Sequence, residues 1–329
     1  MIDFVVLWVD GNDENWREKR DKYAQIDEDK NIARFRDWDN LQYLFRAFEQ
    51  FTPWVRKIHF VTDGHLPKWL NLSHPKLNIV KHQDYIDSKY LPIFSANPLE
   101  IYLNYIDDLA EQFVFFNDDF FITKEISSDR FFQQNLPCDT LISNAISSSS
   151  GVGHFVLNNI EILNKHLDKR VSLKRDFTKW FNIKYGINNF RNVALLPWSR
   201  FTGFVDFHMP QPFLKSTFDE VWDLEEDKLQ QTMSNRFRRC SDCNQYLFRY
   251  WQLASGKFVP ISMKDTKYLT LKSEFLDSSV IEDVISLQKY SMICLNDDSS
   301  IDEKSFIQLK EKIKGSFEKI LPNKSGFEL

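Results

Sequence analysis

Apolar runs alternate with amphipathic stretches along residues 1–120 of the chain. Continuous apolar runs are typical of buried strands, and they occur in DFVVLWV, KIHFVTDG, KLNIVKH and QFVFFNDD. A polar helix is expected after DGNDENW, which follows the first of these runs. The segment DNLQYLFRAFEQF then places Leu41, Leu44, Phe45 and Phe48 on one face of a helix. Strands and helices are therefore predicted to alternate from the N-terminus.

The ends of two helices can also be predicted. Asp39 is the expected N-cap of the helix in DNLQYLFRAFEQF, and Pro53 ends that helix. A further helix is predicted for NPLEIYLNYIDDLAEQ, with Asn97 as its N-cap and Pro98 in its first turn. This helix separates the strand in KLNIVKH from the strand in QFVFFNDD.

Alternation of strands and helices indicates the α/β class. We expect a Rossmann-like, largely parallel sheet flanked by helices, with helical additions in the C-terminal half. Residues 125–200 mix short polar stretches with helical ones, which suggests excursions around a site. Residues 278–319 predict a helix, a strand and a helix, with no obvious chemistry in them.

Polar side chains stand at the ends of the four predicted strands. They are Asp10, Asp63, His82 and the adjacent pair Asp118 and Asp119. In open α/β sheets, ligands bind beyond the carboxyl ends of the strands. We therefore expect these side chains to converge on one crevice.

The acidic pair in QFVFFNDDFFIT lies between two apolar runs, where each carboxylate must be paired or desolvated. Carboxylate oxygens suit a hard divalent cation such as Mg²⁺ or Mn²⁺, which could be held against a diphosphate. Alternatively, Asp118 or Asp119 caps a turn. The spacing alone does not decide between these interpretations.

Other candidate residues have equally plain structural interpretations. Glu100 follows Asn97 by three residues and can complete a capping box there. His82 and His208 are each compatible with a structural histidine. The arginines in NRFRR suit phosphate oxygens, but they also fit a solvated helix face.

Composition excludes some classes of function. The chain has 329 residues, 43% of them hydrophobic, so it can bury the core of a large globular domain. Its formal net charge is −5, and its pI is about 5.9. There is consequently no overall basic field to attract nucleic acid.

Cysteine usage and hydropathy bear on location. The four cysteines do not make a disulfide framework, and the lone CxxC at Cys240 and Cys243 is interpreted as structural, in preference to zinc or redox use. The N-terminal apolar stretch is too short for a signal peptide and has no basic residues before it. No stretch approaches the roughly 20 apolar residues of a membrane span. We therefore expect a cytoplasmic protein.

Several stretches together resemble a known family. IDFVVLWVDGNDENW, the segment from RFRDWDNLQYLF to KHQDYI, and LPIFSANPLEIYLNYIDDLAEQFVFFNDDFFI are similar to the first two blocks of the Stealth proteins. HMPQPF and SNRFRRCSDCNQYL resemble the third and fourth blocks. These proteins are sugar-1-phosphate transferases of bacterial capsule and cell-surface polysaccharide synthesis, similar to the catalytic part of the N-acetylglucosamine-1-phosphotransferase that tags lysosomal enzymes. The resemblance covers residues 1–250 and implies a catalytic domain over 1–264, with residues 265–329 as an α/β extension packed on it.

The resemblance implies roles for individual residues. It places catalytic residues at Glu100, Asp119, His208 and Arg238, and a metal site at Asp118 and Asp119. His208 is the candidate base, and Arg238 with its neighbour Arg236 would neutralise phosphate charge. Substrate-binding positions are Asp10, Gly11, Arg34, Asp37, Asp63, His82 and Arg236. Arg36 and Trp38 depart from the family pattern, in which acidic or small polar residues are expected at their places.

The implied reaction moves a hexose-1-phosphate from a nucleotide diphosphate sugar, such as a UDP-hexose or UDP-N-acetylhexosamine, to a glycan hydroxyl. The nucleoside monophosphate would leave, Mg²⁺ or Mn²⁺ would be the cofactor, and a lipid-linked glycan would be the acceptor. A basic and aromatic face near residues 236–251 is a candidate for peripheral contact with the membrane. Nucleic acid is not an expected partner.

Two other classes remain compatible with the residues. An ordinary metal-dependent glycosyltransferase also uses an α/β sheet and paired acids, but it releases the nucleoside diphosphate. A non-catalytic sugar-binding module would account for the 15% of aromatic residues through stacking on sugar rings. It would have no use for a metal-binding acid pair.

Overall fold

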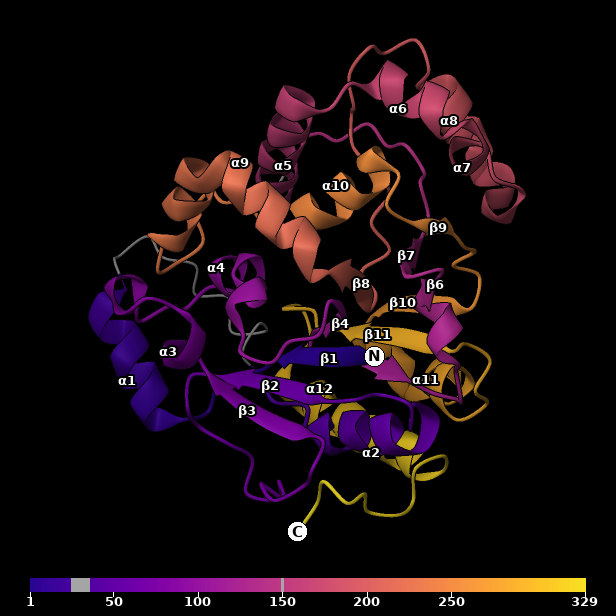
Figure 1. Ribbon diagram of the computed structural model, residues 1–329. Helices are drawn as coiled ribbons and strands as arrows, with labels where there is room; N and C mark the ends of the chain where they lie inside the picture. The colour runs from indigo at the N-terminus through magenta and orange to yellow at the C-terminus, as the bar shows by residue number, and fades with distance from the viewer. Residues whose placement is uncertain (25–35, 149–150) are drawn as a thin grey trace.

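The structure is a computed structural model, and it describes residues 1–24, 36–148 and 151–329. Its central sheet has five strands in the order β3-β2-β1-β4-β8, all parallel except β8 (Figure 1). The mixed α/β class and the largely parallel sheet predicted from the sequence are confirmed. The strands are β1 (Ile2–Leu7), β2 (Ile58–Thr62), β3 (Leu77–Lys81), β4 (Gln112–Phe116) and β8 (Gln211–Leu214).

Alternate residues of the central strands bury opposite faces of this sheet, as the period of two in a strand requires. On one face, Phe4 of β1 and Phe116 of β4 join a core that includes α2 (Leu41–Phe51) and α12 (Glu303–Glu318). On the other face, Val5 and Phe115 join a second core with α5 (Gly151–His166), α9 (Lys215–Met233) and α10 (Tyr246–Ser255). The sheet is consequently covered by helices on both sides, as the continuous apolar strands imply (Figure 1).

Two smaller sheets complete the strand structure. One contains β10 (Thr266–Thr270), β11 (Met292–Asn296) and β5 (Phe120–Ile122), in that order. The other contains β6 (Phe132–Gln133), β7 (Leu136–Asp139) and β9 (Val259–Pro260). Because β5 pairs with β11, a strand from the N-terminal half shares a sheet with strands beyond residue 265. The division of the chain at residue 264 stays a prediction.

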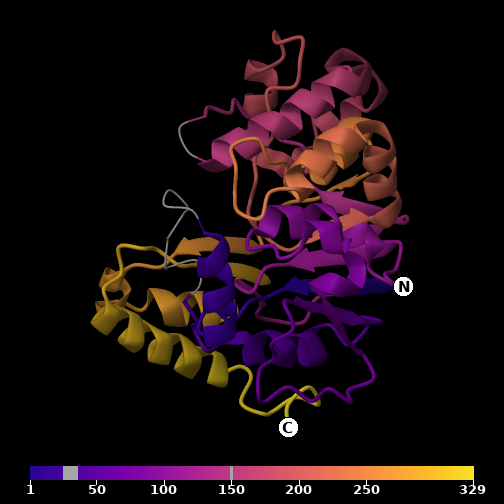
Figure 2. The same ribbon diagram turned by 90° about the vertical axis from the view of Figure 1, so that its left-hand side faces the viewer.

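The remaining helices lie mainly around these sheets (Figures 1 and 2). The α-helices are α1 (Glu14–Tyr23), α3 (His82–Tyr85), α4 (Ala96–Ile101), α5 (Gly151–His166), α6 (Lys169–Arg175), α7 (Phe177–Trp180), α8 (Asn189–Ala194), α9 (Lys215–Met233), α10 (Tyr246–Ser255) and α11 (Val280–Ile285). Short 3₁₀ helices are η2 (Ser88–Tyr90), η3 (Leu103–Tyr105), η4 (Ser128–Arg130), η5 (Ile183–Asn188) and η6 (Ser273–Asp277). The helical additions predicted for the second half are thus present, and α11, β11 and α12 form in the predicted order.

The predicted N-caps at Asp39 and Asn97 are wrong. The N-cap residue of α2 is Asn40, and Asp39 instead pairs with Lys314 of α12 at 2.6 Å. Ser95 caps α4, where its hydroxyl accepts from the Asn97 amide at 3.4 Å. The Asn97 side chain donates to the Asp242 carboxylate at 3.0 Å. Both expected caps are used in contacts between distant segments, which a local pattern does not reveal.

The helix predicted for residues 97–112 is also shorter than expected. It ends at Ile101, and η3 follows it before the chain enters β4. Because the cap is Ser95, Glu100 is not at the third helical position, and the capping-box interpretation of Glu100 is wrong. Its side chain is instead buried and accepts from the backbone amide of Gln245 at 3.3 Å.

Candidate active site

A cavity of about 1040 Å³ opens at the carboxyl ends of β1 and β4. The prediction that polar strand ends converge is confirmed for His82 and for the pair Asp118 and Asp119, which line it. The other sequence-predicted residues in its wall are Asp37, Glu100, His208 and Arg238. A volume at the upper end of the range for small-molecule sites can hold a ligand as large as a nucleotide sugar.

Four substrate-binding candidates are not among the lining residues, and one cannot be placed. Asp10, Gly11, Asp63 and Arg236 lie outside the wall of the cavity. Asp63 pairs with Lys19 at 3.0 Å, and its other oxygen lies 3.4 Å from Nδ1 of His82. Asp63 therefore contacts His82 in the wall of the cavity but does not itself line the cavity. Arg34 lies outside the described residues.

The acidic pair lies where the chain passes from one sheet to another. β4 belongs to the central sheet and ends at Phe116, whereas β5 begins at Phe120 and pairs with β11. The backbone carbonyl of Asp119 accepts from the amide of Leu295 at 2.9 Å. The aromatic residues on either side thus anchor the pair in two different sheets, which fixes the short link at the cavity.

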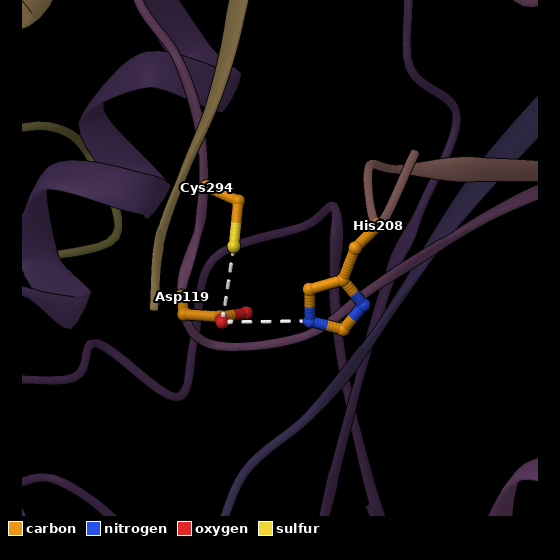
Figure 3. Close-up of side chains that lie close together, drawn as sticks. All are labelled: Asp119, His208 and Cys294. Carbon is orange, nitrogen blue, oxygen red and sulfur yellow. Dashed lines mark hydrogen bonds and ion pairs between the residues drawn. The ribbon is translucent and has the colours of Figure 1, made fainter. Parts of the chain in front are cut away.

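Asp119, His208 and Cys294 gather at one point of the cavity (Figure 3). Oδ2 of Asp119 lies 3.7 Å from Nε2 of His208 and accepts from the Cys294 thiol at 3.2 Å. Oδ1 of Asp119 is buried, with no hydrogen-bond partner. Among the described residues, these three form the group whose ligand atoms lie close enough together to hold a metal ion, within 4.8 Å of one another. Cys294 comes from β11, in the segment for which no chemistry was predicted.

Electrostatics at the pair favour a cation. The Asp118 side chain is exposed and lines the cavity. The protein atoms around the cavity, together with the charge of Asp119, raise the pKa of Asp118 above its usual range. Two like charges side by side are stabilised by a positive charge between them, so the arrangement suits a divalent cation.

Both ring nitrogens of His208 face polar neighbours. Nε2 faces Asp119, and Nδ1 lies 3.3 Å from the hydroxyl of Tyr246. Burial lowers the pKa of His208, but the Asp119 carboxylate outweighs burial and holds the pKa above the usual 6.5. The residue lies in the loop before β8 and has a positive φ of 50°. These contacts orient the ring toward the acidic pair.

A buried ionic cluster supports the loop that carries His208. Asp206, two residues earlier, accepts from Arg249 at 2.7 Å and from the Tyr250 hydroxyl at 2.6 Å. The same guanidinium also holds Asp139 with hydrogen bonds of 2.8 and 2.9 Å. Arg249 is 2% exposed, so these carboxylates and this arginine are compensated almost entirely within the protein.

Glu100 and Arg238 also belong to the wall of the cavity. Burial raises the pKa of Glu100, while the nearby positive charge of Arg238 acts in the other direction. Arg238 lines the cavity, and its positive charge counters the effect of burial on Glu100. Glu100 thus lies in the wall of the site, as expected, and the backbone amide of Gln245 holds its carboxylate there.

Residues that the sequence analysis missed include Asp206, Tyr246 and the segment Asn296–Ser299, all in the wall of the cavity. A signal for this segment was present in the sequence. The strand ending in SMICLNDD has the same Asn-Asp-Asp ending as the strand in QFVFFNDD. Both endings line the cavity, because β11 brings the second one alongside the first.

The charge of the cavity wall also bears on the cofactor. Among the residues that the structure describes, seven carboxylates line it, from Asp37, Glu100, Asp118, Asp119, Asp206, Asp297 and Asp298. The arginines among the described lining residues are Arg20, Arg36 and Arg238. A diphosphate would meet an excess of negative charge there unless a cation accompanied it. This acidic wall suits a divalent cation, and Asp118 and Asp119 as its ligands stay a prediction.

The face predicted for membrane contact near residues 236–251 is wrong for its helical part. The first residues of α10 are buried, including Leu247, Phe248, Tyr250 and Trp251. Their aromatic rings fill the second core, where Phe248 stacks on Phe218 at 3.6 Å. None of the described helices is long and apolar enough to cross a membrane.

Comparisons with known proteins identify the family. Two family models match the chain: Stealth protein CR1, conserved region 1, at residues 2–27, and Stealth protein CR2, conserved region 2, at residues 34–139. A capsular polysaccharide phosphotransferase of Streptococcus pneumoniae, WcwK, is 42% identical over 99% of this chain and 98% of its own length. The chain belongs to the Stealth family. It is therefore an enzyme of the transferase class, as the resemblance predicted.

Other relatives of this Stealth protein cover it equally fully. The exopolysaccharide phosphotransferase cps2G of Lactiplantibacillus plantarum is 37% identical over 99% of this chain and 96% of its own length. The receptor polysaccharide phosphotransferase WefC of Streptococcus oralis is 37% identical over 100% of this chain and 99% of its own length. A solved structure of the galactosyltransferase LgtC with donor and acceptor sugar analogues aligns with 97% of this chain and 96% of its own at a TM-score of 0.41 and 7% identity. That likeness is too distant to indicate chemistry.

Proposed function

We propose that this Stealth protein transfers a hexose-1-phosphate from a nucleotide diphosphate sugar to a hydroxyl of a lipid-linked capsular or cell-surface glycan. The donor we propose is a UDP-hexose or UDP-N-acetylhexosamine, and the product is a phosphodiester. The observation that carries the proposal is the placement of Asp119 and His208 side by side, 3.7 Å apart, in a cavity that Arg238 also lines. Nucleotide sugars are made in the cytoplasm, so we propose that the enzyme works there.

The reaction we propose is a displacement at phosphorus. The glycan hydroxyl attacks the phosphorus that carries the sugar, and the bond from this phosphorus to the oxygen bridging the two phosphates breaks. The nucleoside monophosphate leaves, and the sugar keeps its phosphate. Chemistry of this kind depends chiefly on positioning and charge neutralisation.

His208 is the proposed base for the glycan hydroxyl. A histidine is suited to this role because its unperturbed pKa of about 6.5 is near the working pH. Tyr246 and Asp119 hold the two sides of the ring, so the proton of the hydroxyl would pass to Nε2 on the side of the acidic pair. The cluster of Asp206, Arg249 and Tyr250 would keep the loop of His208 in place.

Asp118 and Asp119 are the proposed holders of Mg²⁺ or Mn²⁺. The fit rests on the unpartnered buried Oδ1 of Asp119, the adjacent carboxylates and the acidic wall of the cavity. A bound cation would neutralise the negative charge of the diphosphate. Arg238 would neutralise charge that develops on the transferred phosphate, and Glu100 would hold that guanidinium in position.

The nucleotide that is released tests the proposal. Purified protein is incubated with UDP-sugars, Mg²⁺ and a deacylated acceptor, and the products are separated by chromatography. Release of UMP is expected, whereas release of UDP would indicate an ordinary glycosyltransferase. Asp119→Asn is expected to lower turnover by about 10²-fold or more. Asp107→Asn, a change of the same chemistry at an exposed site outside the cavity, is the control and is expected to leave turnover intact.

A further inference from the structure

A helical arm projects from the body of the protein. We define the arm as residues 169–200, which contain α6, α7, η5 and α8. In both ribbon views it lies at the end of the molecule opposite the C-terminus, beyond the central sheet (Figures 1 and 2). Its elements contact one another, α6 with α7 and η5 with α8.

The side of the arm that faces the rest of the protein is held by buried contacts. Trp180 and Tyr185 are buried, and Trp180 stacks on Phe201. The buried Asn192 donates to the backbone carbonyls of Leu141 at 2.9 Å and Trp180 at 2.7 Å. These contacts fasten the arm, so its remaining apolar side chains are not needed to hold it in place.

Those remaining apolar side chains are exposed. Of the 19 large hydrophobic residues exposed among the described residues, eight belong to the arm. Ile183 is 92% exposed and Ile187 80%, far beyond the partial exposure of an ordinary surface residue. The full set is Val171, Phe177, Ile183, Ile187, Phe190, Val193, Leu196 and Trp198. So many exposed apolar side chains in one segment indicate a surface that another apolar phase covers.

The arm is also strongly basic. Its sequence holds eight lysines and arginines against a single acid, Asp176, for a net charge of +7. The whole chain carries −5, which leaves −12 on the other residues. Six of the arm's basic side chains are exposed, namely Arg170, Lys174, Arg175, Lys184, Arg191 and Arg200. The partner of the arm must therefore carry negative charge at its surface and have an apolar interior beneath it.

An anionic lipid bilayer combines these two properties. Basic residues interleaved with Trp, Phe and aliphatic side chains are typical of segments that lie in the interface of a membrane, and each lysine or arginine adds to the attraction of anionic headgroups. A protein surface that matched the charge would rarely accept so many aliphatic side chains at once. We propose that residues 169–200 are a docking surface for anionic membranes.

The connections of the arm suit this role. The chain enters it from α5, whose Val152 and Phe155 line the cavity, and leaves it through the loop that carries Asp206 and His208. The chain thus connects the arm to two segments that line the cavity, through the length of α5 on one side and through residues 201–205 on the other. This inference goes beyond the proposed reaction, and it explains how a protein with no spanning helix among its described residues would meet a glycan attached to a lipid.

Co-sedimentation with vesicles tests the proposal without any substrate, so its failure would leave the proposed reaction untouched. The full chain is mixed with vesicles of phosphatidylcholine alone or with added phosphatidylglycerol, and the bound fraction is measured. Binding to the anionic vesicles only, weakened by salt, is expected. Arg170→Glu, Lys174→Glu and Lys184→Glu together are expected to weaken it at least about tenfold. A second variant with Ile183→Ser, Ile187→Ser and Phe190→Ser together is expected to weaken binding by the same factor.

Control variants make the same kinds of change at exposed residues elsewhere. They are Lys264→Glu, Lys304→Glu and Lys319→Glu for charge, and Leu72→Ser, Leu287→Ser and Ile307→Ser for apolar surface. Unchanged binding by the controls, and unchanged UMP release from a water-soluble acceptor by the arm variants, is the expected result. Wild-type protein that ignores anionic vesicles, or controls that weaken binding as much as the arm variants, would overturn the proposal. The proposal would also be overturned if the protein did not bind vesicles but formed a dimer in sedimentation velocity, and if the arm variants dissociated that dimer.

Discussion

Arg36 and Asp297 form a bidentate ion pair between residues that are 261 positions apart in the sequence. Nε donates to Oδ2 at 2.8 Å, and Nη2 donates to Oδ1 at 2.7 Å. The same guanidinium donates to the backbone carbonyls of Asp298 at 2.8 Å and Ile301 at 3.1 Å. Because Asn296–Ser299 forms part of the cavity wall, Arg36 holds that wall in shape. Arg36 departs from the family pattern, and in this protein its guanidinium is paired with Asp297.

Replacing this arginine tests whether the wall determines donor binding. Arg36→Lys keeps the charge but loses the planar fork and the backbone contacts. We expect the KM for the nucleotide sugar to rise about tenfold, with a smaller change in kcat, because the wall binds substrate without taking part in the reaction. Steady-state kinetics at varied donor concentration measures both constants.

The chain offers a matched control for that variant. Arg46 holds Glu328 with the same bidentate geometry, at 2.8 Å for both bonds, and also donates to the carbonyl of Leu321 at 2.9 Å. This pair does not line the cavity. Arg46→Lys is expected to lower the melting temperature without raising the KM. An equal rise in KM for both variants would contradict a local role for Arg36.

Thiol labelling provides a second prediction, which rests on burial. Cys240 is exposed, whereas Cys138, Cys243 and Cys294 are buried. Burial raises the pKa of Cys138 to about 11 and that of Cys243 to about 12, so neither is a reactive thiolate at neutral pH. We expect N-ethylmaleimide to modify one thiol of the native enzyme with full retention of activity, as measured by mass spectrometry and UMP release.

Cys240→Ser is the control for this experiment, and it should abolish the rapid labelling. Loss of activity on labelling, with the modification mapped to Cys294, would mean that this thiol is reached by solvent, contrary to its burial in the structure. The prediction thus also examines the interpretation of the CxxC pair as structural, since Cys243 is buried and Cys240 is at the surface.

The parallel sheet and its strands could be predicted because their signal is local. Four continuous apolar runs form β1, β2, β3 and β4, and the amphipathic face of Leu41 and Phe48 packs on the sheet as α2. The convergence of Asp118 and Asp119 with His82 followed from the geometry of parallel strands alone. Neighbouring residues and a regular period were enough for these features.

Features that depend on distant partners could not be predicted in this way. Asp39 and Asn97 are used by Lys314 and Asp242, so their local signals as helix caps were misleading. The position of Cys294 beside Asp119 depends on β11 pairing with β5 across more than 160 residues of chain, which no local pattern specifies. His208 and Glu100 were placed by resemblance, not by spacing.

A third prediction concerns the ionic cluster behind His208. Arg249→Met removes the guanidinium that joins Asp139 and Asp206 but keeps the bulk of the side chain. The buried Asp139 and the half-buried Asp206 would then lose their arginine, and we expect the free energy of unfolding to fall by about 3–5 kcal/mol. Chemical denaturation followed by circular dichroism measures this change.

The triple variant Arg249→Met, Asp139→Asn and Asp206→Asn is the companion measurement. It removes the carboxylate charges together with the arginine, so most of the lost stability should return. If Arg249→Met unfolds at the same denaturant concentration as the wild type, the cluster does not stabilise the fold, and its proposed support of the His208 loop would also be wrong.

The fourth prediction follows from a carboxylate buried at the start of β1. Asp3 is fully buried and accepts from Arg56 at 2.8 and 2.5 Å and from the Ala110 amide at 2.8 Å, and it lies 3.1 Å from His59. Burial raises its pKa, but these partners outweigh burial and hold the pKa below 3.8. A carboxylate of this kind adds stability above its unfolded pKa and loses it as the pH falls through its folded pKa.

We therefore expect Asp3→Asn to lower the free energy of unfolding by about 3 kcal/mol at pH 7, because His59 loses its carboxylate partner and Arg56 keeps only Asp108. The difference between wild type and variant should shrink as the pH falls below 3.8, the ordinary value for an aspartate, since Asp3 then becomes protonated. Urea denaturation at a series of pH values measures it, with the exposed Asp107→Asn as control. A difference that stays constant down to the acid unfolding of the wild type would mean that the Asp3 ion pair contributes nothing through its charge.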